Sequence, residues 1–253
     1  MRESLHFESF IPFLDNHSFT IVLMMLIDYF IVFIILLLGT RNLKLKPGKS
    51  QNLVEWAVNF ICVYADDIIG KDDAPRFYPL ILTLFFYIFI GNLMGLIPGL
   101  VSPTSMLSVT AALAIIVFLY EWISGIAKNG VINYFKHYTG GPGVPTPLKP
   151  FLFFIELISD ISRPLSLSFR LFGNIMAKEI LLSVLIILIL IFWPTISTNA
   201  VGAFLAGFSF VLRPLIIILG VLVSLIQASV FTLLTCIYLA GAVAAHKEHS
   251  ETH

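Results

Sequence analysis

Apolar stretches about as long as a membrane crossing follow one another along most of this sequence. The run 19–38 has roughly the length of one bilayer span, and Asp28 is its only charge. Similar runs cover residues 77–98 and 107–127. Only 12% of the residues are charged, whereas soluble domains usually have about 25%. Because lipid leaves backbone groups no other hydrogen-bond partners, we expect an all-α, polytopic integral membrane protein.

The last hundred residues carry two helical patterns that are too long for one straight crossing. As a helix, residues 151–193 would measure about 65 Å, whereas a bilayer core is about 30 Å thick. Either residues 156–170 form a separate amphipathic surface helix, or one long helix crosses the membrane at a strong tilt. A second run, 200–245, follows a short turn at 194–199 and has Arg213 as its only charge. We therefore expect five membrane helices, the last two forming a long, tilted hairpin.

Basic residues mark alternate loops and set the predicted orientation. They fall in two loops, with Arg41, Lys44, Lys46 and Lys49 in the first and Lys128, Lys136 and Lys149 in the second. The positive-inside rule makes both loops cytoplasmic, with the N-terminus outside and the C-terminus in the cytoplasm. Residues 51–70 have apolar side chains at helical spacing and polar ones opposite, which predicts an amphipathic interfacial helix. We expect residues 1–253 to form a single membrane domain.

Composition also excludes several classes of function. The formal net charge is zero, which argues against nucleic acid as a partner. The two cysteines, Cys62 and Cys236, cannot form a disulfide framework. We expect no cofactor and no metal site.

A polar stripe on the first long helix is the main candidate functional site. Its members fall within about 40° of Arg170 at 100° per residue, and they are Glu156, Ser159, Arg163, Ser166, Arg170 and Asn174. An arginine at bilayer depth costs about 2.5–3.5 kcal/mol and cannot shed its charge, which favours a role in ion conduction. The alternative is a structural ion pair with Glu156 or Asp160. Glu179 points to the opposite side of this helix, and Gln227 is the centre of a small and polar arc on the second one.

Other polar residues have simpler interpretations. Arg163 and Arg213 each precede a proline and are interpreted as cations whose side chains reach the membrane interface. Asp28 and Glu121 are single acids within spans, and we expect each to lie near a headgroup or to pair with another helix. Asn92 is interpreted as a helix–helix contact.

The segment from Ser162 to Asn174 reads SRPLSLSFRLFGN and is followed by Glu179. It resembles the signature of subunit a of F-type ATP synthases, roughly S-[KR]-P-x-S-L-x-x-R-L-F-G-N. A second match is the segment LIQA at residues 225–228, with Tyr238 beyond it. Weaker matches are at residues 47–49, 91–98 and 103–105, so the resemblance covers about residues 19 to 245.

The resemblance implies a stator subunit that performs no bond chemistry on its own. Two aqueous half-channels would carry protons to and from carboxylates on a rotating c-subunit ring, and Arg170 would prevent a proton short-circuit between them. The implied partners are the c ring, the b subunits of the peripheral stalk, the rest of the ATP synthase and the lipid bilayer. Asn174, Glu179 and Gln227 match positions in the proton path or beside the arginine. Glu156 and Ser166 match polar positions on the same helix, and the implied location is a bacterial inner membrane.

Gly220 departs from the family pattern, because many relatives carry Glu or His at this position. We therefore expect Glu179 to carry the titratable role alone, and a glutamate introduced at residue 220 to restore part of the flux lost on changing Glu179. Many relatives also carry Asp and Asn near the positions of Met106 and Ser108, so this chain lacks those polar groups in the loop before the third span. Two other functions remain open. An ion-coupled secondary transporter would need inverted repeats, which are not visible, and an assembly subunit would tolerate lysine in place of Arg170.

Overall fold

The computed structural model describes residues 16–40, 48–97, 100–131, 146–195 and 200–244, and every regular element within these ranges is a helix. The α-helices are α1 (Asn16–Thr40), α2 (Lys49–Ile69), α3 (Tyr78–Met94), α4 (Leu107–Asn129), α6 (Lys149–Phe192) and α7 (Ala200–Ala244). The short 3-10 helices are η1 (Ala74–Arg76), η2 (Pro103–Ser105), η3 (Thr146–Leu148) and η4 (Trp193–Thr195). Both chain ends, the basic residues from 41 to 46 and Lys136 lie outside the described residues.

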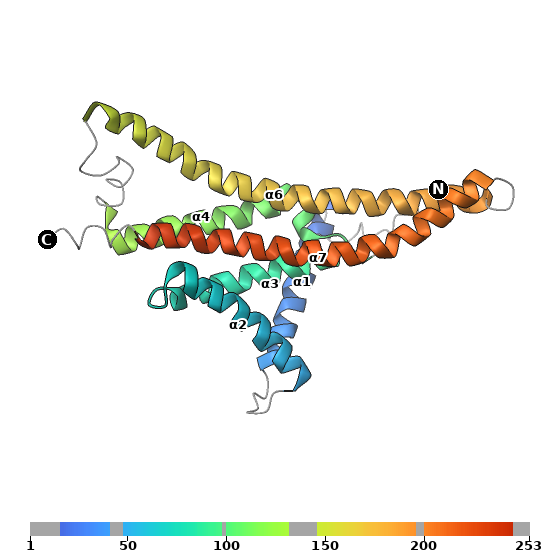
Figure 1. Ribbon diagram of the computed structural model, residues 1–253, viewed down its shortest axis with the longest axis horizontal. Coiled ribbons are helices and arrows are strands. Elements are labelled where there is room, and N and C mark those ends of the chain that lie inside the picture. The colour runs from blue at the N-terminus through green and yellow to red at the C-terminus, as the bar shows by residue number, and fades with distance from the viewer. Residues whose placement is uncertain (1–15, 41–47, 98–99, 132–145, 196–199, 245–253) are drawn as a thin grey trace.

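The predicted fold class, an all-α polytopic membrane protein, is confirmed. Within the described ranges, α1, α4, α6 and α7 are long and apolar enough to cross a membrane, and α3 is a shorter apolar helix. The helix α6 is continuous over 44 residues and α7 over 45. One long helix therefore replaces the alternative of a separate surface helix at 156–170. The two long helices lie side by side along the molecule's longest dimension, and α1 lies at a steep angle to them (Figure 1).

Both long helices continue through a proline. Pro164 in α6 and Pro214 in α7 each lack the backbone N–H that would bond to the preceding turn. Such prolines are tolerated in membrane helices when neighbouring helices and side chains satisfy the freed backbone groups. The hydroxyl of Ser162 donates to the carbonyl of Ser159 at 2.7 Å in the turn before Pro164, so local side-chain hydrogen bonding accompanies this position.

The helix α3 forms the centre of the packed core. More than half of its residues are buried, on all sides of the helix, which is the pattern of a helix enclosed by others. Leu171 and Ile175 of α6, and Phe231 and Leu239 of α7, are buried in the same cluster. By contrast, many large apolar side chains of the long helices are exposed and face the region that lipid or a partner would occupy. Only 17% of the apolar window of either long helix is buried, so the hairpin offers most of its surface outward.

The helix α2 has the amphipathic character that was predicted. Ile61 and Ala65 are buried against the other helices, whereas Leu53 and Trp56 are exposed. The helix ends at Gly70, whose φ of 96° lies in the left-handed region that favours glycine, and its N–H bonds to the carbonyl of Asp66. Exposed apolar side chains on a helix of this kind fit a position in the membrane interface.

Candidate functional site

Arg170 lies near the middle of α6 and is exposed. Its guanidinium forms no ion pair with any of the described residues. The structural pair with Glu156 or Asp160, which the sequence left open, is therefore not formed by Arg170. The charge instead points away from the protein's own core.

Arg163 forms the ion pairs one to two turns before Arg170. Its Nη1 lies 2.9 Å from Oε1 of Glu121 on α4 and 3.1 Å from Oδ1 of Asp160. Its Nη2 lies 4.0 Å from Oε1 of Glu156, and its guanidinium carbon is 5.4 Å from the ring centre of Tyr238 on α7. Arg163 is therefore not a simple interfacial cation, as the sequence suggested, because it connects three helices. Glu121 is helix-paired, which was one of its two predicted interpretations.

Asn174 and Gln227 connect the two long helices beside Arg170. The side-chain amide of Asn174 donates to Oε1 of Gln227 at 2.7 Å. Gln227 is buried, with an exposed fraction of 4%, so it packs into the α6–α7 contact. The sequence predicted Gln227 as the centre of a small and polar arc on the second long helix, and its amide oxygen is used there in the contact with α6. Ser166, one turn before Arg170, is exposed.

Glu179 lies nine residues beyond Arg170, which is about 13 Å along the helix axis and half a turn round it. It is half-buried, on the side of α6 that faces η2. The backbone N–H of Ser102 donates to its Oε1 at 3.2 Å. A Cβ at Gly95 would lie 2.9 Å from the same oxygen, so the absence of a side chain at residue 95 leaves space for the carboxylate.

Lys178 is a buried cation that the sequence reasoning did not single out. Its Nζ donates to the carbonyl of Asn92 on α3 at 3.0 Å and to the hydroxyl of Ser224 on α7 at 3.1 Å. The signal was present in the sequence, because a lysine in an apolar segment directly before Glu179 needs partners. Asn92 is fully buried and takes part in a helix–helix contact, as interpreted.

Gly220 lies against Lys178 rather than beside open space. A Cβ at residue 220 would lie 2.6 Å from Cδ2 of Leu96 and 3.3 Å from Cδ of Lys178. The hairpin does bring residue 220 near this part of α6, but the space that a larger side chain needs is taken. The structure therefore argues against rescue by a glutamate at residue 220, which would have to displace both neighbours.

A cavity of about 200 Å³ opens beside Glu179. Its walls also include Arg213, Ser183 and residues of the segment between α3 and η2. The Nε atom of Arg213 is buried and has no hydrogen-bond partner within the described residues. Arg213 thus lines a polar cavity with Glu179, where the sequence suggested only an interfacial cation. Such a cavity can hold water next to a carboxylate.

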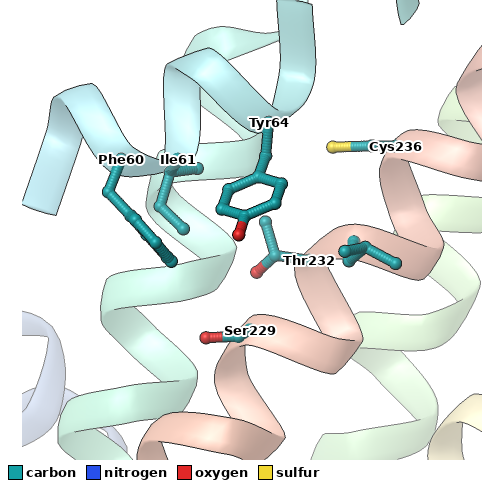
Figure 2. Close-up of a pocket in the computed structure, with 7 residues that line it drawn as sticks. Phe60, Ile61, Tyr64, Ser229, Thr232 and Cys236 are labelled. Carbon is teal, nitrogen blue, oxygen red and sulfur yellow. The ribbon is translucent and has the colours of Figure 1, made fainter. Parts of the chain in front are cut away.

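A second cavity of about 130 Å³ lies between α2 and α7. Figure 2 shows Phe60 and Tyr64 of α2 facing Thr232 and Cys236 of α7 across it. The hydroxyl of Thr232 bonds to the carbonyl four residues earlier in its own helix, and most of the lining is apolar. This cavity therefore offers little chemistry. In the described part of the chain no three His, Cys, Asp or Glu side chains gather in a way that could hold a metal ion.

Comparison with known proteins decides between the classes left open by the sequence. The profile of the family described as ATP synthase A chain matches residues 22–240. The chain belongs to this family. Relatives named ATP synthase subunit a share 38% identity over 234 residues in Nitratiruptor sp. and 38% over 240 residues in Helicobacter pylori. The matched parts cover 92% and 94% of this chain, and 94% and 95% of the two relatives.

A third relative of the same name, from Desulfotalea psychrophila, is 43% identical over 204 residues, which are 79% of this chain and 75% of that protein. Membership in the ATP synthase A chain family and the apolar helices together identify an integral membrane component of an F-type ATP synthase. The resemblance recognised in the sequence is confirmed.

Proposed function

We propose that this chain is the stator subunit that carries protons to and from the carboxylates of a c-subunit ring through two aqueous half-channels. Arg170 separates the two half-channels and prevents protons from passing directly between them. The subunit contacts the c ring and the b subunits of the peripheral stalk. It lies in a bacterial inner membrane, with its N-terminus outside and its C-terminus in the cytoplasm.

The exposed guanidinium of Arg170 carries this proposal. A permanent cation within a membrane hairpin, without an anionic partner among the described residues, needs one from another subunit. A carboxylate on a passing ring subunit supplies that partner, and the nearby cation favours its ionised form. A fixed positive charge also repels a proton moving past it, which separates the two sides.

Two polar regions lie on either side of Arg170 along α6 and support the two half-channels. The cavity beside Glu179 has Arg213 in its wall. Glu179 lies about 13 Å from Arg170 along the helix axis, towards the C-terminal end of α6. We call this cavity the outer half-channel. Glu156 and Asp160 lie in the opposite direction, next to Arg163, and mark the inner half-channel. Asn174 and Gln227 join the helices between the two regions.

Replacement of Arg170 in the whole ATP synthase tests the proposal. Arg170→Ala, Arg170→Gln and Arg170→Lys should each abolish proton-driven ATP synthesis in membrane vesicles, while the c ring still copurifies with the subunit. Lysine fails because its compact ammonium lacks the flat guanidinium and can lose its proton when buried. The matched control is Arg76→Lys, at an exposed arginine of η1, which should leave the rate unchanged. Synthesis near the wild-type rate with Arg170→Lys would falsify the proposal.

A further inference from the structure

Asp28 is a buried carboxyl group on α1 that none of the preceding contacts explains. Its exposed fraction is 0%, and neither of its carboxyl oxygens has a hydrogen-bond partner within the described residues. The apolar run from Thr20 to Leu37 contains no other Asp and no Glu, Lys or Arg. Burying a carboxylate without partners is costly, so such a residue inside a membrane segment points to a function.

The carboxyl of Asp28 lies against the backbone of α3 at Gly91. A Cβ at residue 91 would lie 2.8 Å from Oδ2 of Asp28 and 3.6 Å from Cγ2 of Thr104. The glycine therefore leaves the space that the carboxyl occupies, next to Thr104 of η2. Even an alanine at residue 91 would push the carboxyl away from this position.

Two buried hydroxyl groups lie between this place and the backbone N–H that binds Glu179. The Ser102 hydroxyl donates to the carbonyl of Gly91 at 2.7 Å and lies 2.7 Å from the Thr104 hydroxyl. The backbone N–H of Ser102 donates to Glu179. Ser102 and Thr104 are both fully buried, and each of their hydroxyls has more than one oxygen within hydrogen-bond distance. The carbonyl of Gly91 and the Asn92 side-chain oxygen can only accept, but the hydrogen bond between the two hydroxyls can run in either direction. Such a reversible bond is what proton exchange along hydroxyl groups requires.

We propose that Asp28 is a second proton-binding carboxyl of the outer half-channel, which exchanges its proton with Glu179 through the hydroxyls of Ser102 and Thr104 and through water. The inference rests on the proposed function, because it assigns a second residue to the same path. In the exchange, each hydroxyl or water accepts one proton and releases another. Asp28 thus becomes a carboxylate as Glu179 becomes a carboxylic acid, and the reverse transfer restores both.

The other ionisable groups near this path are few. Tyr87 of α3 is the titratable side chain close to Asp28. Lys178 reaches the carbonyl of Asn92 from the side of α6. Asn92 also accepts a hydrogen bond from the Thr104 hydroxyl at 2.7 Å. No described cation pairs with Asp28, so in its resting state the buried carboxyl holds its proton.

The test measures passive proton conduction through the membrane sector in vesicles stripped of the catalytic part, driven by a potassium diffusion potential. Asp28→Asn keeps the shape of the side chain but removes the exchangeable acid, and Thr104→Val removes one hydroxyl. Each should slow conduction about 10-fold, the effect of raising a barrier by about 1.4 kcal/mol. Because the two residues act in series, the double variant should be no slower than the slower single variant.

Matched controls come from outside the path. Asp67→Asn changes an exposed acid of α2, and Thr235→Val changes a fully buried threonine whose hydroxyl bonds only within α7. Both should conduct as the wild type does. The infrared spectrum of Asp28→Asn should also lack one carbonyl band of a neutral carboxylic acid, which the wild type shows and which shifts in heavy water.

Three results would overturn the inference. The first is proton conduction at the wild-type rate in Asp28→Asn or in Thr104→Val. The second is a double variant in which the two fold-reductions in conduction multiply. The third is an infrared spectrum of Asp28→Asn that keeps every carboxylic-acid band of the wild type. If Asp28→Asn does not assemble, Thr104→Val alone decides, and normal conduction there refutes the relay. The proposed function fails separately, through ATP synthesis near the wild-type rate with Arg170→Lys. Normal conduction in Glu179→Gln removes Glu179 from the path, and with it the exchange with Asp28. A block in Glu179→Gln with full conduction in Asp28→Asn refutes only the role of Asp28.

Discussion

Gly220→Ala should destabilise the subunit, although alanine is the better helix former. The added Cβ would lie 2.6 Å from Cδ2 of Leu96 and 3.3 Å from Cδ of Lys178. Leu96 is itself buried, with an exposed fraction of 7%, so its side chain has little room to move away. Overpacking of this kind typically costs about 1–3 kcal/mol, which outweighs the gain of up to about 1 kcal/mol from helix propensity.

Two other glycines of α7 provide matched controls. A Cβ at Gly207 or at Gly241 would meet nothing within 4 Å. Gly207→Ala and Gly241→Ala should therefore leave stability unchanged or raise it by up to about 1 kcal/mol. The same chemical change on the same helix thus has opposite signs, and only the packing of Gly220 distinguishes the three positions.

Thermal unfolding of the purified membrane sector measures the difference. A dye that becomes fluorescent on reacting with thiols reports unfolding through Cys236, whose exposed fraction is 1%. The central overpacking cost of about 2 kcal/mol less the propensity gain of about 1 kcal/mol leaves a net cost of about 1 kcal/mol. Gly220→Ala should therefore lower the apparent midpoint by about 2–4 °C. In a Leu96→Ala background, where the methyl groups that cause the clash are gone, the further change at Gly220 should cost nothing. The packing argument is refuted if Gly220→Ala matches Gly241→Ala, or if it costs as much in the Leu96→Ala background.

Three further predictions concern the polar groups of the hairpin. Glu179→Gln should slow passive proton conduction by at least about 10-fold while the c ring still copurifies, and normal conduction would remove Glu179 from the path. Lys178→Met removes the donor to the Asn92 carbonyl and to the Ser224 hydroxyl, so the subunit should lose about 1–3 kcal/mol of stability. An unchanged thermal midpoint would contradict the bonds described. Asn174→Leu and Gln227→Leu should show a coupling of about 0.5–1.5 kcal/mol in a double-mutant cycle of thermal stability, and additive effects would show that the 2.7 Å bond contributes nothing.

The sequence predicted the helices well because their signals are local. The predicted ranges 151–193 and 200–245 nearly coincide with α6 and α7, since apolar periodicity over forty residues leaves few other folds in lipid. The angular rule of 100° per residue also placed Glu179 on the side of α6 opposite Arg170, and the structure has Glu179 facing η2 and Arg170 exposed.

Contacts between distant segments could not be predicted in the same way. Arg163 and Glu121 are 42 positions apart, and Asn174 and Gln227 are 53 apart. Periodicity gives the face of one helix that a residue occupies, but not the neighbour that this face meets. For this reason sequence reasoning assigned Arg163 to the membrane interface and did not predict that Gln227 would bind Asn174. Lys178 could have been recognised as a buried cation, but its partners come from two other helices.

The central claim is that the face of α6 bearing Arg170 contacts the c ring, and disulfide crosslinking tests it most directly. With Cys62 and Cys236 changed to serine, Ser166→Cys should crosslink to a cysteine placed beside the ring carboxylate, because Ser166 is exposed one turn from Arg170. Leu167→Cys is buried, and Ile161→Cys is exposed on the opposite face of α6, so neither should crosslink. Crosslinks from Ile161→Cys with none from Ser166→Cys would contradict the account, because the ring would then lie on the other side of the hairpin.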